Sequence, residues 1–511
     1  MPGRLGQGVV IGLPAVLALA YCLGHLNWYL GTPLGRVPVL DERENLDLAE
    51  AIFGGSLPAA PFYRAMGYPS ALSLLRLLGV SQGGLFPAAL ALGALLHGIG
   101  AALAASIALR WFGARAALLA GLLFALDPVL VHYATQALDS AFSLTLFLAG
   151  LLCLVQAVAA PERTLQWAGA GLLWAGAALA RPNYLLAWIL VPVLAAVQAA
   201  GWRKRARILS ASLAGVVLFG GAAAWQKRVS GVAGFLPWQG PYNLWAANRP
   251  GANGRYYTQH VSLPDALARA NPARAESMIL YAQETGGGPG DIPSMNAHWR
   301  RRFLEEVGAH PLRWGRLMAR KAYALLNDWE QYNNKTYAFH KALSPWLSWN
   351  PIGWGVILML AVAGAASLAS GSPRSAALCA AVGLACAASA VLFFVSARFR
   401  LPMAALCIIL AGGALARPDF WRGWPARRRA ALALCVLAAG LVAFSRIGGV
   451  DDRSTFVQDH ALMARAAFTV GDDRAALSEA EAALAMQPWH PDATAIARAA
   501  RAELAGRPPQ P

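Results

Sequence analysis

The sequence predicts an all-α protein built as a polytopic membrane helical bundle. Of its 511 residues, 57% are hydrophobic and only 14% are charged, whereas a soluble globular protein carries about 25% charged residues. Apolar runs long enough to cross ~30 Å of hydrocarbon as a helix recur along the chain, without the alternation of a β-barrel. The first run is continuous and lacks a small-residue cleavage site, so it is interpreted as a retained span.

Hydropathy predicts about eleven spans. They lie at approximately 9–29, 85–109, 115–131, 138–158, 166–180, 183–200, 208–226, 351–370, 376–396, 401–416 and 429–446. The apolar segment 69–80 is too short to cross and is interpreted as an interfacial or re-entrant helix. All six cysteines lie inside apolar runs without a CxxC pair, so neither a disulfide framework nor a zinc site is predicted.

Lysines and arginines in short loops predict the orientation, with the N-terminus in the cytoplasm. The basic loops 203–207 and 422–429 then lie on the cytoplasmic side. The first loop 30–68, the segment 227–345 and everything from 447 onward lie on the other side, which for a bacterial inner membrane is the periplasm. The net charge of +17 is attributed to these loops and to anionic lipid. Nucleic acid is not a predicted partner, because the basic residues are dispersed and no reader motif appears.

Four parts are predicted: a membrane module (1–226), an outer insertion too long for a plain loop (227–345), further transmembrane helices (346–446) and a helical tail (447–511). In the tail, residues 457–503 are predicted as helix, Gly471-Asp472 turn, helix, Pro488 and helix. Ala476, Ala483 and Pro488 fall where a tetratricopeptide repeat places small residues and its closing proline. About one and a half repeats are too few to be stable alone, so the tail is expected to pack on the membrane domain or on a protein partner. An Ala-rich helical hairpin without a binding role is the alternative.

Ionisable residues at the outer ends of the predicted spans are the candidate site, because such residues are costly at membrane depth and usually serve a site or pair with each other. They are Asp41 and Glu42 after span one, Asp139 before span four, Arg181 after span five, and Arg398 and Arg400 before span ten. A carboxylate can act as general base for a hydroxyl, and arginines can bind and neutralise a departing phosphate.

Each candidate has a purely structural alternative. Arg181 and Arg398 are alternatively snorkelling anchors at the membrane surface. Asp139 is alternatively a helix cap, and Asp127 before Pro128 alternatively only ends span three. The acidic run 41–50 is alternatively the solvated start of a helix.

The ordered motifs resemble the GT-C glycosyltransferases, and most of all the protein mannosyltransferase and aminoarabinose transferase type (glycosyltransferase family 39-like). The motifs are Asp-Glu (41–42), Pro-Phe-Tyr-Arg (61–64), Gly-Tyr-Pro (67–69), Leu-Asp-Pro (126–128), Leu-Ala-Arg-Pro (179–182), the Asn/Gly-rich stretch 241–254, the stretch 321–334 and Ala-Arg-Phe-Arg-Leu-Pro (397–402). The resemblance spans roughly 5–420. The chain lacks the extra luminal domain of the protein mannosyltransferases, which leaves the glycan, lipid or protein acceptor undefined.

The resemblance implies transfer of a sugar from a polyprenyl-phosphate donor on the non-cytoplasmic face, with inversion. It implies that Asp41 is the catalytic base and that Arg181, Arg398, Arg400 and Arg64 contact the carrier phosphate. Glu42 and Asp139 are expected to position the acceptor or to raise the pKa of Asp41 by like charge. No cofactor is predicted, since a divalent metal on Asp41 and Asp139 would have too few ligands.

Two other classes are alternatives. A transporter or flippase for a lipid-linked precursor would need polar residues deep in the spans and internal symmetry. A membrane scaffold would act through its tail. Deletion of 447–511 is expected to abolish the function of a scaffold but to be compatible with the chemistry of an enzyme.

Overall fold

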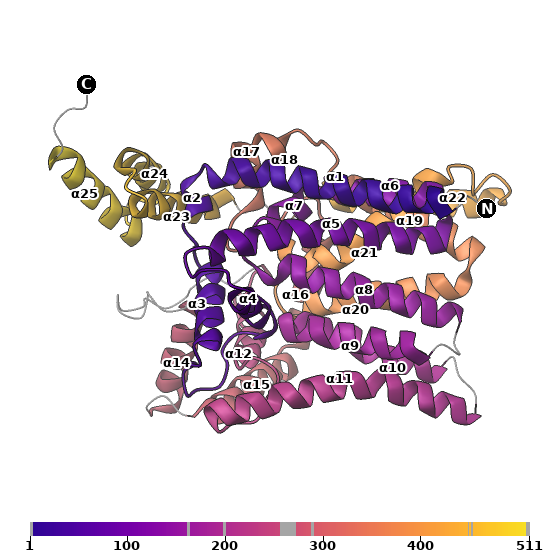
Figure 1. The fold of residues 1–511 in the computed structure, drawn as a ribbon, viewed down its shortest axis with the longest axis horizontal. Coiled ribbons are helices and arrows are strands. Elements are labelled where there is room, and N and C mark those ends of the chain that lie inside the picture. Colours follow the sequence, from indigo (N-terminus) through magenta and orange to yellow (C-terminus); the bar gives the residue numbers. More distant parts are fainter. Residues whose placement is uncertain are drawn as a thin grey trace.

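The computed structural model describes residues 4–160, 164–197, 201–255, 272–287, 291–447, 449–450 and 453–506, and this part of the chain is helical apart from one isolated β-bridge between Arg255 and Val395. Long helices run side by side as a bundle (Figure 1). They are α1 (Arg4–Leu30), α5 (Leu85–Phe112), α6 (Ala114–Leu126), α8 (Asp139–Ala159), α9 (Thr164–Ala180), α10 (Leu185–Val197), α11 (Gly201–Ser230), α19 (Trp354–Gly371), α20 (Pro373–Leu392), α21 (Ala397–Ala416) and α22 (Ala426–Phe444).

Each of the eleven predicted spans overlaps one of these helices, although the third is broken at Asp127 and residues 198–200 of the sixth lie outside the described part. Among the described residues, seven helices are long and apolar enough to cross a membrane, or eight if one bent pair is a single span. The chain is therefore an integral membrane protein with multiple apolar spans. The other three are weaker candidates, because α9 and α10 have 17 and 13 residues and α22 begins with three arginines.

The bent pair corrects the predicted continuous span 115–131. Here α6 ends at Leu126, and α7 (Pro128–Ala134) continues at an angle of 57°. Pro128 has no backbone N–H to continue the helix. The Asp127 side chain caps α7 instead, accepting hydrogen bonds from the backbone N–H groups of Val129 and Leu130, both at 2.9 Å. Asp127 thus has a structural role, because it marks the end of the third predicted span as the alternative interpretation stated.

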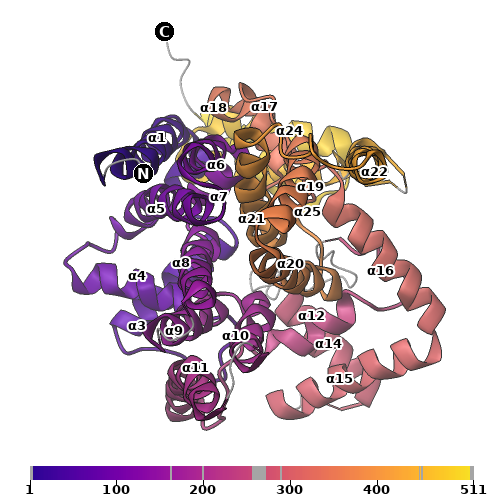
Figure 2. The same ribbon diagram turned by 90° about the vertical axis from the view of Figure 1, so that its right-hand side faces the viewer.

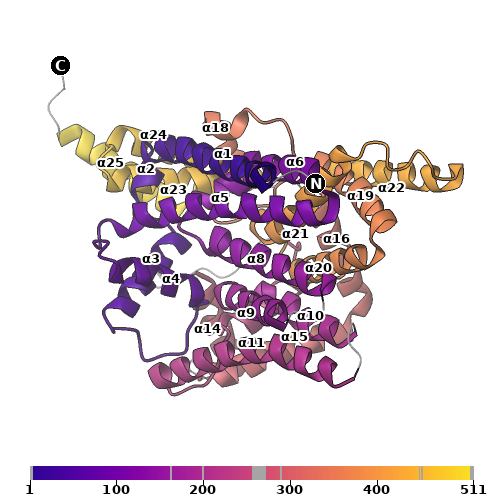
Figure 3. The ribbon, with the colours of Figure 1, turned by 45° about the vertical axis from the view of Figure 1, so that its right-hand side comes forward.

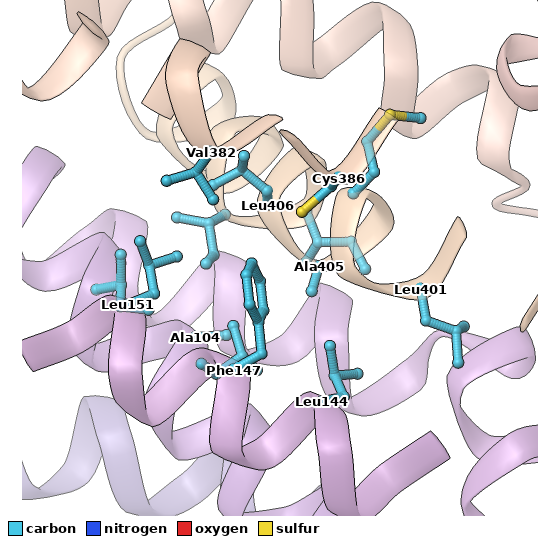
Figure 4. Packing of buried hydrophobic residues seen from close by; sticks show 14 of the residues in the cluster. Ala104, Leu144, Phe147, Leu151, Val382, Cys386, Leu401, Ala405 and Leu406 are labelled. Atoms are coloured by element: carbon cyan, nitrogen blue, oxygen red, sulfur yellow. The ribbon is translucent and has the colours of Figure 1, made fainter. Parts of the chain in front are cut away.

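One hydrophobic core joins the N-terminal and C-terminal helices of the bundle (Figure 4). Leu144, Phe147 and Leu151 of α8 face Val382 of α20 and Leu406 of α21. The contact between α6 and α21 is closer still, because a Cβ on Gly412 would lie 2.6 Å from the backbone nitrogen of Ala120. Small residues permit such close helix contacts in membranes.

The segments predicted for the outer side gather at one end of the bundle, away from the N-terminus (Figures 1 and 3). They include α2 (Pro33–Arg36), α3 (Asp41–Phe53), α4 (Gly67–Leu77), α12 (Gln239–Ala246) and α14 (Pro272–Thr285). The 11-residue α4 occupies the position of the predicted non-spanning segment 69–80.

The second half of the outer insertion contains two helices, α15 (Ile292–Ala309) and α16 (Pro311–Leu326). Pro311 begins the second, which ends before Trp329. Viewed along the bundle, both lie across it while the spans are seen end-on (Figure 2). Trp299 of α15 packs with Tyr242 and Trp245 of α12 against Phe394, which follows α20, and so attaches the insertion to the bundle.

The tail forms three helices, α23 (Phe456–Thr469), α24 (Asp473–Met486) and α25 (Pro491–Gly506), in the predicted order of helix, Gly471 turn, helix and helix. Gly471 has φ +80°, a conformation that favours glycine. Only α23 reaches the bundle core: Leu462 and Ala466 join a cluster of Tyr29, Leu34 and Leu46. The tail therefore packs on the membrane domain.

Candidate active site

Asp41 and Glu42 begin helix α3, and the turn before them is strained. Leu40 has φ 50° and ψ −127°, which a side-chain-bearing residue rarely adopts. Such strain persists only where surrounding contacts impose it, and it gathers at functional sites. It directs both carboxylates inward, and Asp41 and Glu42 are 7% and 1% exposed.

Five of the predicted residues meet in one largely buried chain of alternating charge, Arg64–Asp41–Arg398–Asp139–Arg181, called here the ion-pair chain. Arg64 Nη2 binds Asp41 Oδ1, and Arg398 Nη1 binds Asp41 Oδ2 at 3.0 Å. Arg398 Nη2 also binds Asp139 Oδ1. Arg181 Nε binds Asp139 Oδ2 at 2.7 Å, and its Nη1 donates to the backbone carbonyl of Arg398 at 2.9 Å.

The ion-pair chain joins parts of the sequence that are hundreds of residues apart: the first outer loop, the beginnings of α3, α8 and α21, and the end of α9. Asp139, Arg181 and Arg398 are buried, so Arg181 and Arg398 are not snorkelling anchors. Asp139 stands in the first turn of α8 and pairs with both arginines, which is more than a cap does.

The pKa of Asp41 is lowered, whereas the negative charges of Glu42 and Asp139 were expected to raise it. Burial by itself would raise it, but the guanidinium groups of Arg64 and Arg398 outweigh burial and hold the pKa of Asp41 well below its usual range. Asp41 is therefore ionised at neutral pH, and each of its oxygens already has a cationic partner. Glu42 and Asp139 do not raise its pKa, because the arginines stand closer.

Glu42 turns away from Asp41 into a second polar cluster. Lys335 Nζ lies 2.8 Å from Glu42 Oε2 and 2.7 Å from the Tyr29 hydroxyl. Glu42 also accepts hydrogen bonds from the backbone N–H groups of Val39 and Ala137. Burial would lower the pKa of Lys335, but Glu42 raises it above its ordinary value. Glu42 thus ties α3 to α1 and to the turn before α8, rather than facing an acceptor.

Arg400 does not join the ion-pair chain, in contrast to the expectation. It pairs with Glu330, donates to the carbonyl of Asn327 at 2.6 Å and lies over the Trp354 ring. Residues two positions apart in the sequence lie about 200° apart around a helix. The side chains of Arg398 and Arg400 therefore leave α21 on opposite faces. Arg400 is a structural residue, buried with Glu330.

The remaining acids of the run 41–50 lie on the outer faces of α3. Glu44 binds Arg64 at 2.5 Å and Glu50 binds Arg76 at 2.8 Å, while Asp47 is exposed. Arg64 therefore contacts two carboxylates at once. Through Arg64, Glu44 adds a third carboxylate to the edge of the ion-pair chain.

No group of three or more histidine, cysteine, aspartate or glutamate residues in the described part of the chain is arranged to hold a metal ion. Asp41 and Asp139 both bind the guanidinium of Arg398, which stands where a shared cation would have to lie.

Sequence reasoning missed three residues that contact the site. Lys335 binds Glu42, Asn334 is a polar neighbour of Asp41 that helps to lower the pKa of its carboxyl group, and Ser140 accepts a hydrogen bond from Arg398 Nε at 3.2 Å. One signal was available. Lys335 directly follows the motif stretch 321–334 and is a lone charge among polar, uncharged residues.

Lys321 is a buried cation beside the Asn/Gly-rich stretch 241–254. It is fully buried, and its Nζ lies 3.0 Å from Asn248 Oδ1, an uncharged partner that Trp314 Nε1 also contacts. Burial lowers the pKa of Lys321 to about 7. The stretch itself is fixed near α21, because the Gly254 carbonyl accepts a hydrogen bond from the Val395 N–H at 3.1 Å.

Replacing Lys321 by Met is expected to stabilise the protein at pH 6, and less so at pH 9. Between a folded pKa of about 7 and an unfolded value near 10.5, the unfolded state holds a proton that the folded state lacks. The native lysine therefore costs stability at low pH, by at most about 5 kcal/mol, and this cost fades as the pH rises through that window. Thermal unfolding of the purified protein at both pH values measures it.

Lys227→Met, on the exposed end of α11, is the matched control and should change the unfolding temperature little at either pH. An equal gain for Lys321→Met at pH 6 and pH 9 would show that Lys321 remains charged in the folded protein.

No protein-family model matches the chain, and no curated protein matches its sequence. Among solved structures it is similar to the oligosaccharyltransferase of Archaeoglobus fulgidus tethered with an acceptor peptide, with a TM-score of 0.41 and 12% identity. That match covers 90% of this chain but only 57% of the archaeal one. It is also similar to ArnT from Cupriavidus metallidurans bound to undecaprenyl phosphate, with a TM-score of 0.32 and 16% identity over 79% of this chain and 78% of that one.

Proposed function

We propose that this chain is a membrane glycosyltransferase of the GT-C type. It transfers a sugar from a polyprenyl-phosphate carrier to an acceptor hydroxyl on the non-cytoplasmic face of a bacterial inner membrane, and its N-terminus is cytoplasmic. The observation that carries the proposal is the ion-pair chain, which puts three arginines and two carboxylates at one end of a membrane bundle. The sequence motifs that resemble the GT-C class support it.

Arg64 and Arg398 bind the donor phosphate in this proposal, with Arg181 behind them. A sugar phosphodiester carries one negative charge, and the departing polyprenyl phosphate gains a second as the bond to the sugar breaks. Buried guanidinium groups interact more strongly with the second charge than with the first, so they stabilise the transition state more than the bound donor. Arg398 already pairs with one oxygen from each of two carboxylates, and two phosphate oxygens could take such places on a guanidinium.

Asp41 acts as general base. In the structure both of its oxygens are held by arginines. When the donor phosphate draws those arginines away, the pKa of Asp41 returns toward its ordinary value and one oxygen becomes free. The acceptor oxygen then attacks the anomeric carbon, the bond from that carbon to the phosphate oxygen breaks, and the hydroxyl proton passes to Asp41. One displacement inverts the configuration, and polyprenyl phosphate and the glycosylated acceptor leave.

Asp139 holds Arg398 and Arg181 in place rather than contacting the acceptor. When the phosphate competes with Asp41 for Arg398, Asp139 is the partner that keeps this arginine in the site. The donor must therefore bind before Asp41 can work, so the donor is the first substrate to bind.

The direct test is to incubate the purified protein with a panel of polyprenyl-phosphate sugars and to measure free polyprenyl phosphate. Release with at least one sugar is expected. If wild-type protein that is folded and inserted releases none of the carriers, with membrane extract supplying acceptors, the proposal is wrong.

A further inference from the structure

The first helix of the tail touches the segment that contacts the site. Asp459 of α23 is 1% exposed, and its Oδ1 accepts a hydrogen bond from the Thr336 backbone N–H at 2.9 Å. The same oxygen lies 3.4 Å from His340 Nε2. A carboxylate from the end of the chain is therefore buried among residues of the outer insertion.

Four consecutive residues, 333–336, each contact a different part of the molecule. Asn333 Nδ2 donates to Ser396 Oγ at 3.2 Å, and Ser396 caps α21, which carries Arg398. Asn334 is a polar neighbour of the Asp41 carboxylate, and Lys335 Nζ lies 2.8 Å from Glu42 Oε2. Thr336 is bound by Asp459. The segment 333–336 thus connects the two halves of the candidate site to the tail.

Helix α23 is itself firmly placed. Leu462 packs in the apolar cluster formed by α1, α2 and α3. On the insertion side the Phe339 ring lies 5.4 Å from the Phe456 ring and 4.8 Å from the His460 ring. Because α23 is fixed on both sides, Asp459 meets Thr336 without a further loss of chain freedom.

We infer that α23 is a positioning element of the site and that Asp459 is its positioning residue. By binding the Thr336 N–H, Asp459 fixes the segment 333–336. Through Lys335 the segment holds the carboxylate of Glu42, next to Asp41, and through Asn333 it holds Ser396 at the start of α21. The effect on catalysis rests on the proposed function; the effect on the segment does not. Deletion of 447–511 is then damaging to an enzyme too, so it does not distinguish an enzyme from a scaffold as the sequence suggested.

Two substitutions at one position separate the hydrogen bond from the charge. Asp459→Asn keeps an oxygen that can accept from Thr336, whereas Asp459→Val removes it at similar size. Glu481→Gln, in an exposed pair with Arg501, is the control within the tail. Hydrogen exchange followed by mass spectrometry on peptides covering 331–340 gives a readout that does not depend on activity.

Asp459→Val is expected to speed hydrogen exchange in 331–340 about tenfold or more. It should also lower kcat, measured by release of the carrier, by about 10²-fold, because a small displacement of site residues has effects of this size. The KM for the donor should change less, because Arg64 and Arg398 remain. Asp459→Asn and Glu481→Gln should stay within about threefold of wild type. Unchanged exchange in Asp459→Val, or equal damage by Asn and Val, would overturn the inference.

Thr336→Pro reaches the same hydrogen bond from the other side if Asp459→Val does not fold. Thr336 has φ −75°, which proline adopts, and the substitution removes the N–H without altering the tail. Faster exchange in 331–335 is expected, and unchanged exchange contradicts the inference. If exchange responds as expected but wild-type protein transfers no sugar, the positioning of the segment stands and the proposed function falls.

Discussion

Asp41→Asn is expected to lower the rate of sugar transfer by about 10²–10⁴-fold, the range that general-base catalysis contributes. Asparagine has the size and shape of aspartate but cannot accept the proton of the acceptor hydroxyl. It also leaves Arg64 and Arg398 without one of their anionic partners. The donor phosphate then meets less competition, so the KM for the donor should not rise. The loss should fall on kcat, measured by release of polyprenyl phosphate.

Asp47→Asn is the matched control, because Asp47 stands on the same helix, is exposed and undergoes the same chemical change. It should keep full activity. An Asp41→Asn variant that is expressed and inserted normally and transfers sugar at the wild-type rate would exclude Asp41 as the base.

Arg398→Gln is expected to have the largest effect on stability as well as on donor binding. Arg398 is the only residue of the ion-pair chain that contacts both Asp41 and Asp139. Its removal leaves two buried carboxylates near each other with one cation fewer, and breaking a buried pair in this way costs about 3–5 kcal/mol. Arg398→Lys should rescue little, because one ammonium group cannot replace a planar guanidinium that binds Asp41, Asp139 and Ser140 together.

Thermal unfolding and binding of polyprenyl phosphate measure the two effects. In the double variant Arg398→Gln with Asp139→Asn, one uncompensated charge is removed, so the two losses of stability should be clearly less than additive. Arg422→Gln, in an exposed pair with Asp419, is the control and should be neutral. Strict additivity would mean that Arg398 and Asp139 do not interact in the folded protein.

Much of the fold could be predicted from hydropathy, because the length of an apolar run measures whether a helix can cross a bilayer. All eleven predicted spans overlap helices of the bundle, although one of them is a bent pair. Local chemistry also predicted the helix order of the tail, where Gly471 and Pro488 interrupt the helices. The span 115–131 was predicted as continuous, but the alternative given for Asp127 already ended the helix before Pro128, where the structure has the break.

The site was predictable where charge stood at a span end. Asp41, Asp139, Arg181 and Arg398 are costly where they stand, and the structure brings all four together. Arg400 satisfied the same rule but points the other way, because its direction depends on the phase of α21. Asn334 and Asp459 carried no signal of their own, since a polar residue in a loop or in the first turn of a helix is ordinarily solvated.

The sequence by itself determined that this is a helical membrane protein, which segments form its bundle helices, and which charged residues needed partners. These properties follow from single residues and their neighbours along the chain. Only the tertiary structure decided which group pairs with each of them. Arg398 pairs with Asp41, Lys335 pairs with Glu42, and Asp459 accepts from the Thr336 backbone N–H. A buried charge or N–H group must be satisfied, but the packing of helices far apart in the chain selects the group that satisfies it.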